Sequence, residues 1–144
     1  MRIANPVIEW CKRSNKPCLK FTFRGYLEAD EAESAVDMWK GAFIERQEGQ
    51  VILVWDCLNM TGYSRRARST WTRAMLEMKS QIAAIWLISN SPLIKMGASV
   101  MALFSGLEVH IVTSESEIRE YALPPSAPFL KRKKRDDQTD SLSL

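Results

Sequence analysis

Two predominantly apolar runs, residues 51–55 and 83–89, constrain most strongly what this chain can fold into. The first run is continuously apolar and rich in β-branched residues, which is the pattern of a strand buried on both faces. Between the two runs, residues 65–80 repeat apolar side chains at helical spacing. Because a helix that joins two buried strands returns the chain to the same edge of a sheet, the pattern predicts an α/β fold with a mostly parallel sheet.

The N-terminal segment predicts an antiparallel hairpin at the edge of that sheet. Residues 7–11 and 18–24 nearly alternate apolar and polar side chains on either side of a polar turn. Gly25 is expected to end the second strand, and residues 28–46 then carry apolar side chains at three- and four-residue steps, which predicts a helix. The exposed edge of the hairpin would permit a homodimer by strand addition.

Local signals predict three further elements after the second apolar run. Ser91 followed by Pro92 predicts the start of a third helix. A last strand is expected over residues 108–113, and Ser114 with Glu117 forms the capping box of a short final helix. The expected order of elements is therefore β-β-α-β-α-β-α-β-α, a mixed and mostly parallel sheet with an antiparallel hairpin at its N-terminal end.

With 144 residues, the chain has the size of one domain, which we expect to occupy residues 1–123. Residues 124–144 lack hydrophobic periodicity and are expected to form a disordered basic and polar tail. That tail holds five Lys and Arg residues and three Asp residues, so it accounts for +2 of the net charge of +3. The predicted domain is therefore nearly neutral, and nucleic acid is not an expected partner.

The distribution of apolar residues and cysteines predicts a cytoplasmic protein without a membrane span. The longest apolar run, residues 82–88, is far shorter than the roughly 20 residues that cross a bilayer. The N-terminus lacks the apolar segment of a secretion signal. The three cysteines, Cys11, Cys18 and Cys57, are odd in number and form no C-x-x-C pair, so we expect them to be reduced thiols.

In an open α/β sheet, ligands bind beyond the carboxyl ends of the strands, and this rule selects two predicted loops. The first is residues 56–64, which leads into the second helix, and the other is residues 89–91, which leads into the third. The candidate binding residues in and beside these loops are Asp56, Asn59, Thr61, Ser64, Arg65, Arg66, Arg68, Ser89, Asn90 and Ser91.

Three arginines, Arg65, Arg66 and Arg68, stand in the first turn of the second predicted helix, where positive charge opposes the helix dipole. Together with the amides at the helix start they would suit a phosphate or a carboxylate group. Alternatively, they pair with acids such as Asp56 or extend into solvent. Ser64 is predicted to cap this helix, and a phosphate on its hydroxyl would be neutralised by the arginines.

The sequence lacks a recognisable set of catalytic groups, so we do not expect an enzyme. His110 is the only histidine and lies within a predicted strand, where a packed or solvent-facing role is more frequent than proton transfer. There is no nucleophile elbow, phosphate-binding loop or dinucleotide-binding fingerprint. No metal or cofactor is expected either, because the cysteines and His110 do not match the spacing of a ligand set.

Four segments, residues 51–56, 63–68, 85–89 and 96–98, carry a resemblance to a known family. In residues and in their order of elements they resemble the STAS family, and more narrowly its divergent bacterial branch related to anti-sigma-factor antagonists. The resemblance covers roughly residues 18–123 and implies a STAS-like α/β module that binds protein partners. In the antagonists, a kinase partner phosphorylates a serine before the second helix, and this breaks the complex.

At that helix start the antagonists carry Asp-Ser, a small residue and Gly, whereas this chain has Tyr63, Ser64, Arg65 and Arg66. Ser64 and Thr61 are the nearby candidates for phosphorylation. The resemblance implies a non-enzymatic regulatory module whose partner is a kinase or an anti-sigma-like regulator. The alternative hypothesis is a binder of an anionic small molecule, a nucleotide or a lipid headgroup, at the start of the second helix.

Overall fold

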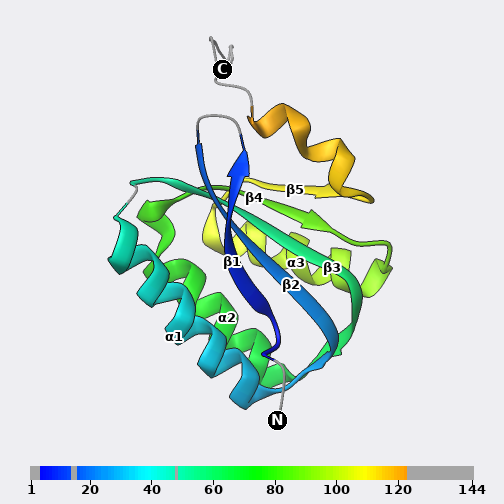
Figure 1. Ribbon diagram of the computed structural model, residues 1–144. Helices are drawn as coiled ribbons and strands as arrows, with labels where there is room; N and C mark the ends of the chain where they lie inside the picture. The colour runs from blue at the N-terminus through cyan, green and yellow to red at the C-terminus, as the bar shows by residue number, and fades with distance from the viewer. Residues whose placement is uncertain (1–3, 14–15, 48, 123–144) are drawn as a thin grey trace.

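The two apolar runs form the central strands, β3 (Val51–Tyr63) and β4 (Ile82–Ile88), of a five-stranded sheet. The computed structural model describes residues 4–13, 16–47 and 49–122, so the predicted tail lies outside the described residues. The remaining strands are β1 (Val7–Arg13), β2 (Lys16–Leu27) and β5 (Val109–Val112). Strand order in the sheet follows the chain; β1 is antiparallel to β2 and all other neighbours are parallel (Figure 1). The predicted mixed, mostly parallel sheet with an N-terminal hairpin is confirmed.

All three α-helices pack on one face of the sheet. They are α1 (Ala29–Arg46), α2 (Arg65–Glu77) and α3 (Pro92–Ser105). The larger core cluster joins their buried side chains to every second residue of the central strands, for example Leu53 and Trp55 of β3. Within the described part of the chain, no helix is long and apolar enough to cross a membrane.

Aromatic rings pack α1 and α2 against the sheet. Phe21 of β2 meets Trp39 of α1 edge to face at 5.2 Å between ring centroids, and Trp71 of α2 at 5.7 Å. Trp39 and Trp71 contact each other at 5.3 Å. Such pairs contribute roughly 0.5–1.5 kcal/mol each beyond the burial of their area, so this cluster sets the position of both helices on the sheet.

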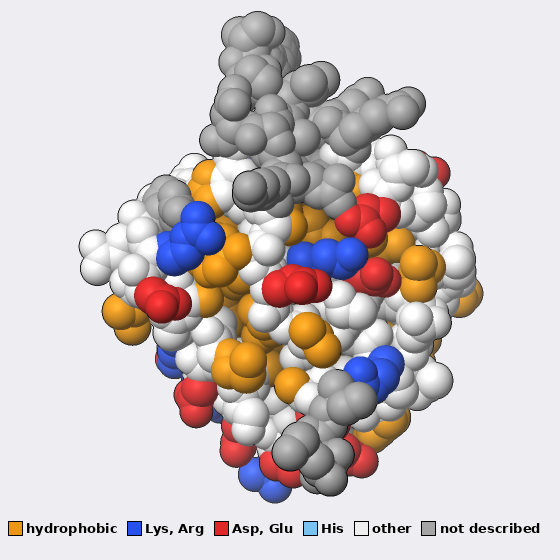
Figure 2. Space-filling model, in the orientation of Figure 1, with side chains coloured by type: hydrophobic (Ala, Val, Ile, Leu, Met, Phe, Trp, Pro, Cys, Tyr) orange, Lys and Arg blue, Asp and Glu red, His pale blue; other side chains and the backbone are white. Residues whose placement is uncertain are grey.

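The opposite face of the sheet carries a smaller core under a short 3-10 helix, η2 (Glu115–Ala122). Ile118 of η2 is fully buried against strand residues that include Ile52 and Trp86. A salt bridge of 3.1 Å from Lys20 to Glu115 joins β2 to η2. Figure 2 shows hydrophobic side chains gathered on the surface above the strands, with acidic and basic side chains beside them.

The predicted final α-helix is wrong in type, because its residues form η2 instead. Neither of the two side-chain hydrogen bonds of the expected capping box is present. The carboxylate of Glu117 accepts a hydrogen bond of 2.9 Å from the backbone N–H of Thr113, one residue earlier than a capping box requires. The Ser114 hydroxyl forms a hydrogen bond with the hydroxyl of Ser116 and does not cap the backbone amides of this turn. A short segment with such an irregular start adopts the tighter 3-10 form.

Several strand boundaries also differ from the prediction, because the first hairpin strand extends to Arg13, the second begins at Lys16, and β5 is one residue shorter at each end; the two differences that shape the site lie in β2 and β3. Gly25 does not end β2, which continues to Leu27, and residues 56–63 are not a loop but the second half of β3. These two extensions pair with each other, from Thr22 opposite Asp56 to Leu27 opposite Tyr63, through two register shifts. Gly25 adopts a φ of 62°, which glycine tolerates without strain. The polar residues in this stretch resemble a loop, but ladder hydrogen bonds to β2 hold it extended.

A cross-link tests the register of the hairpin. Cys11 of β1 lies directly opposite Cys18 of β2. Cα atoms of opposed residues in antiparallel strands are about 4.5–5.5 Å apart, within the range that a disulfide spans. We expect mild oxidation with diamide to link Cys11 to Cys18 in the folded protein, as read by peptide mass spectrometry, while Cys57 stays reduced because it lies on the opposite face of the sheet from both of them.

The Cys57→Ser variant is the control and should form the same link. A link that includes Cys57, or no link under conditions that leave the protein folded, would contradict the register.

Candidate functional site

The sequence-predicted residues gather at one end of the sheet, where β4 stops and β3 continues. Asp56 is the register partner of Ile88, the last residue of β4, so Asp56 lies beside the chain as it turns toward α3. Ser89 is fully buried at that turn, and its hydroxyl accepts a hydrogen bond of 3.0 Å from the backbone N–H of Ser91. Asn90 is exposed between them.

Three of the predicted residues belong to the extended half of β3. Asp56 is half-buried, and its carboxylate accepts a hydrogen bond of 3.2 Å from the backbone N–H of Leu58. Asn59 and Thr61 are exposed. Because β3 holds all three in a sheet, they are rigidly placed rather than carried on a flexible loop.

Ser64 and Ser91 cap the two helices that begin at this end. The Ser64 hydroxyl accepts a hydrogen bond of 3.0 Å from the N–H of Ala67, and the Ser91 hydroxyl accepts one of 3.3 Å from the N–H of Ile94. The backbone N–H of Ser64 also donates to the carbonyl of Leu27, 3.0 Å away. The end of β2 thereby fixes the point at which α2 starts, and both predicted caps are present.

Arg65, Arg66 and Arg68 are exposed on the first turn of α2. In the part of the chain that the structure describes, none of them forms an ion pair, so the predicted alternative of pairing with Asp56 is wrong. Their positive charges meet the positive end of the helix dipole without a counter-charge. This arrangement costs stability and leaves three exposed guanidinium groups without an ionic partner among the described residues.

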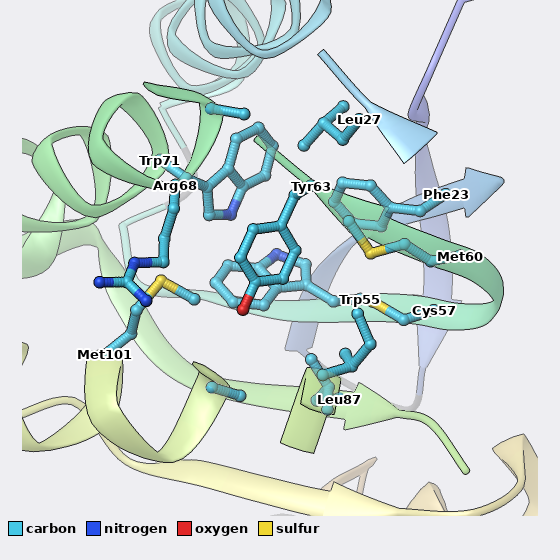
Figure 3. Close-up of a pocket in the computed structure, with 13 residues that line it drawn as sticks. Phe23, Leu27, Trp55, Cys57, Met60, Tyr63, Arg68, Trp71, Leu87 and Met101 are labelled. Carbon is cyan, nitrogen blue, oxygen red and sulfur yellow. The ribbon is translucent and has the colours of Figure 1, made fainter. Parts of the chain in front are cut away.

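An apolar cavity of about 50 Å³ lies beneath the starts of α2 and α3. Strand β3 provides Trp55, Met60 and Tyr63 to its walls, and α3 provides Met101. Arg68 is the only charged side chain in the lining, and it extends from α2 toward Met101 (Figure 3). Arg65 and Arg66 do not line the cavity, so Arg68 differs from the other two arginines in its position.

Tyr63 reaches across the cavity to α3. Its hydroxyl lies against Gly97, where an added Cβ would overlap it. Figure 3 shows the ring between Leu27 and the side chains of Trp55 and Leu87, with the hydroxyl directed toward the side where Arg68 and Met101 lie. The absence of a side chain at Gly97 lets the Tyr63 hydroxyl approach α3 closely.

The remaining reactive side chains offer little chemistry. Burial raises the pKa of the Cys57 thiol, and the charge of Asp56 raises it further, so the thiol stays protonated and unreactive. His110 stacks on Trp86 at 4.3 Å on the other face of the sheet, and its hydrogen bond to Glu108 lowers the pKa of that carboxyl. Among the described residues no group of three or more His, Cys, Asp or Glu side chains could hold a metal.

Helix α3 presents a second apolar surface, directed outward. Leu93, Met96, Leu103 and Phe104 are 57%, 60%, 85% and 76% exposed. In chain order, successive members of this set are three, seven and one positions apart, and this spacing places them along one side of the helix. Lys95 is the only charged residue of α3, so polar groups scarcely interrupt this surface.

Sequence analysis missed both apolar features. Trp55 and Trp71 lie in segments of apolar periodicity and are buried, but they also line the cavity. Tyr63 was noted only as a neighbour of Ser64. A tyrosine directly before a helix cap, together with a glycine inside a helix of otherwise apolar residues, is the signal that could have indicated this contact.

Comparisons with solved structures identify the fold. An uncharacterized protein of the DUF3478 family from Shewanella loihica PV-4, described as having a SpoIIAA-like fold, superposes with a TM-score of 0.71 at 14% identity over 85% of this chain and 98% of that one. The anti-sigma factor antagonist SpoIIAA in its unphosphorylated form superposes with a TM-score of 0.57 at 11% identity over 80% of this chain and 96% of that one. The chain has a SpoIIAA-like fold.

This likeness confirms the predicted STAS-like fold. At identities of 11% and 14% it concerns the fold alone. The sequence matches no family model and no curated protein.

The contact between Tyr63 and Gly97 predicts the cost of a methyl group on α3. Gly97→Ala places a Cβ on the Tyr63 hydroxyl and should lower the free energy of unfolding by about 1–3 kcal/mol, as measured by urea denaturation. In a Tyr63→Phe background the hydroxyl is absent and the nearest ring atom is 3.3 Å away, so the same substitution should cost little or nothing.

Gly41 of α1 provides the matched control. It has open space around it, so Gly41→Ala should raise stability by about 0.5–1 kcal/mol through helix propensity alone. An equal effect of Gly97→Ala in both backgrounds would contradict the contact.

Proposed function

We propose that this chain is a regulatory domain, without catalytic activity, that acts by binding a protein partner. The proposed docking surface combines the start of α2 with the outward side of α3. It consists of Arg65, Arg66, Arg68, Leu93, Met96, Leu103 and Phe104.

The outward side of α3 is the observation that carries this proposal. Leu103 and Phe104 are both more than three-quarters exposed, and water contact with such large apolar side chains is unfavourable. Clustered apolar residues of this kind mark interaction sites, and methionine, aromatic residues and arginine are enriched in interfaces. The three arginines of α2 would complement acidic groups on the partner. The partner surface that fits is therefore one that combines an apolar patch with negative charge.

The likeness in fold supports a regulatory role. SpoIIAA is an anti-sigma factor antagonist, and the superposition with it covers 80% of this chain. By that analogy the partner is a kinase or an anti-sigma-like regulator. A cytoplasmic location agrees with Cys11, Cys18 and Cys57 being thiols rather than disulfides.

A charge placed on the outward side of α3 tests the docking surface. The double variant Leu103→Glu and Phe104→Glu changes two exposed positions, so the fold should remain intact while capture of the partner falls at least tenfold. The measurement is affinity capture from an extract of the source cell, quantified by mass spectrometry against a sample without bait.

Ile44→Glu is the control, because Ile44 is 70% exposed on α1, away from the proposed surface. Its captured proteins should match those of the unmodified chain. Equal loss in both variants, or a captured set that neither variant changes, would contradict the docking surface.

Phosphorylation of Ser64 or Thr61 is the regulation that we propose for this surface. The Ser64 hydroxyl lies at the start of α2 beside the three arginines, which could neutralise a phosphate there. Thr61 is exposed on β3 close to the same helix start.

Substitutions at Ser64 separate capping from signalling. Ser64→Ala removes the side-chain cap and should lower the free energy of unfolding by about 1 kcal/mol, whereas Ser64→Asp retains a capping oxygen and should be nearly neutral. If the negative charge acts as a switch, only Ser64→Asp should alter partner capture. Native mass spectrometry of the protein from its source cell should then detect an added phosphate, and its absence under all growth conditions would contradict this regulation.

A further inference from the structure

The cavity beneath α2 and α3 has the composition of a ligand site. Its walls are formed by aromatic, aliphatic and sulphur-containing side chains, such as Trp55, Met60 and Met101. A polar ligand group would lose its hydration there without gaining hydrogen bonds, so the walls favour an apolar group. This composition argues against a nucleotide base, which requires several polar partners.

The polar groups of the lining are hydrogen-bond donors. The Arg68 guanidinium carries a full positive charge and has no ionic partner among the described residues. The indole N–H of Trp55 is buried and meets no acceptor in the described part of the chain. The Tyr63 hydroxyl points toward the side of the cavity where Arg68 lies (Figure 3). The surface of the cavity itself is almost wholly apolar and Arg68 is exposed, so an anion would meet the Arg68 guanidinium outside the apolar space and only an attached apolar chain would enter it.

Among the described residues, no acidic side chain lines the cavity, so none would repel a bound anion. The Cys57 thiol, also part of the lining, remains neutral because burial raises its pKa. Arg65 stands three residues before Arg68, on the same side of α2, and adds to the positive potential at the mouth. The N-terminal end of the helix dipole has the same sign.

We propose that the cavity binds a small carboxylate with a slender apolar chain. The carboxylate accepts hydrogen bonds from the Arg68 guanidinium and the Tyr63 hydroxyl, while the chain enters between Trp55 and Met101. This site goes beyond the proposed protein partner, because its apolar part lies beneath the docking surface, with which it shares Arg68.

The size of the cavity gives the Tyr63 side chain a second role, which is to limit the length of the ligand. The cavity is partly open, and its volume of about 50 Å³ is much smaller than the roughly 150 Å³ that accommodates benzene in an engineered protein. Tyr63 is half-buried, and its ring occupies the space between Trp55 and α3. A longer chain therefore enters only as the Tyr63 ring turns outward, so this side chain limits the length of the ligand.

Octanoate is the probe, titrated into the full chain and followed by protein NMR and by the thermal midpoint. We expect octanoate to bind and octan-1-ol, which has the same chain without the charge, to bind at least tenfold more weakly. Arg68→Gln should weaken octanoate binding about tenfold or more, because a charge-assisted hydrogen bond is lost. Tyr63→Phe should weaken it several-fold, and Tyr63→Ala should favour longer fatty carboxylates over octanoate.

Arg66→Gln is the matched control, since it removes the same charge from the same helix turn outside the cavity. It should leave the affinity for octanoate within about twofold of the unmodified chain. Equal losses from Arg66→Gln and Arg68→Gln, equal binding of octanoate and octan-1-ol, or no binding at millimolar octanoate would each overturn the proposal. The measurement needs no partner protein, so its outcome is independent of the partner-capture result.

Discussion

The contact of Trp71 with Phe21 and Trp39 is the interaction on which the arrangement of this molecule depends. Trp71 lies in the middle of α2, and its ring meets both the sheet and α1 within 6 Å. With its middle fixed in this way and its first residue tied to the end of β2, α2 has little freedom to move. The arginines at its start and the cavity beneath it are positioned by the same two restraints.

Most of the fold was predictable because its helices and strands bury their side chains with regular periods. The apolar side chains at helical spacing in residues 65–80, namely Ala67, Trp71, Ala74, Met75 and Met78, are all buried. The second half of β3 was not predictable, since Asp56, Asn59 and Gly62 are residue types that are depleted in strands and typical of turns. Only the pairing with β2, a contact between residues more than 30 positions apart in sequence, makes that segment a strand.

The candidate site was predictable in place but not in depth. The rule that ligands bind beyond the strand ends selected Ser64, Ser89 and Ser91, and the structure places all three at one end of the sheet, where each side chain accepts a hydrogen bond from a backbone N–H. It could not distinguish Arg68 from Arg66, because that difference depends on the exact direction of each side chain from α2. The cavity itself arises where core residues fail to fill the space completely, and no sequence period encodes such a gap.

The placement of all three α-helices on one face has a consequence for how far the chain can be shortened. The reverse face of the sheet relies on η2, whose Ile118 covers buried residues of β3 and β4. A protein ending before Glu115 would keep its larger core yet expose a strip of isoleucine, valine and tryptophan on two central strands. Exposed apolar strand surface of that kind promotes self-association. The short segment after β5 therefore keeps the protein soluble by covering these apolar residues. Its length and composition alone do not indicate this role.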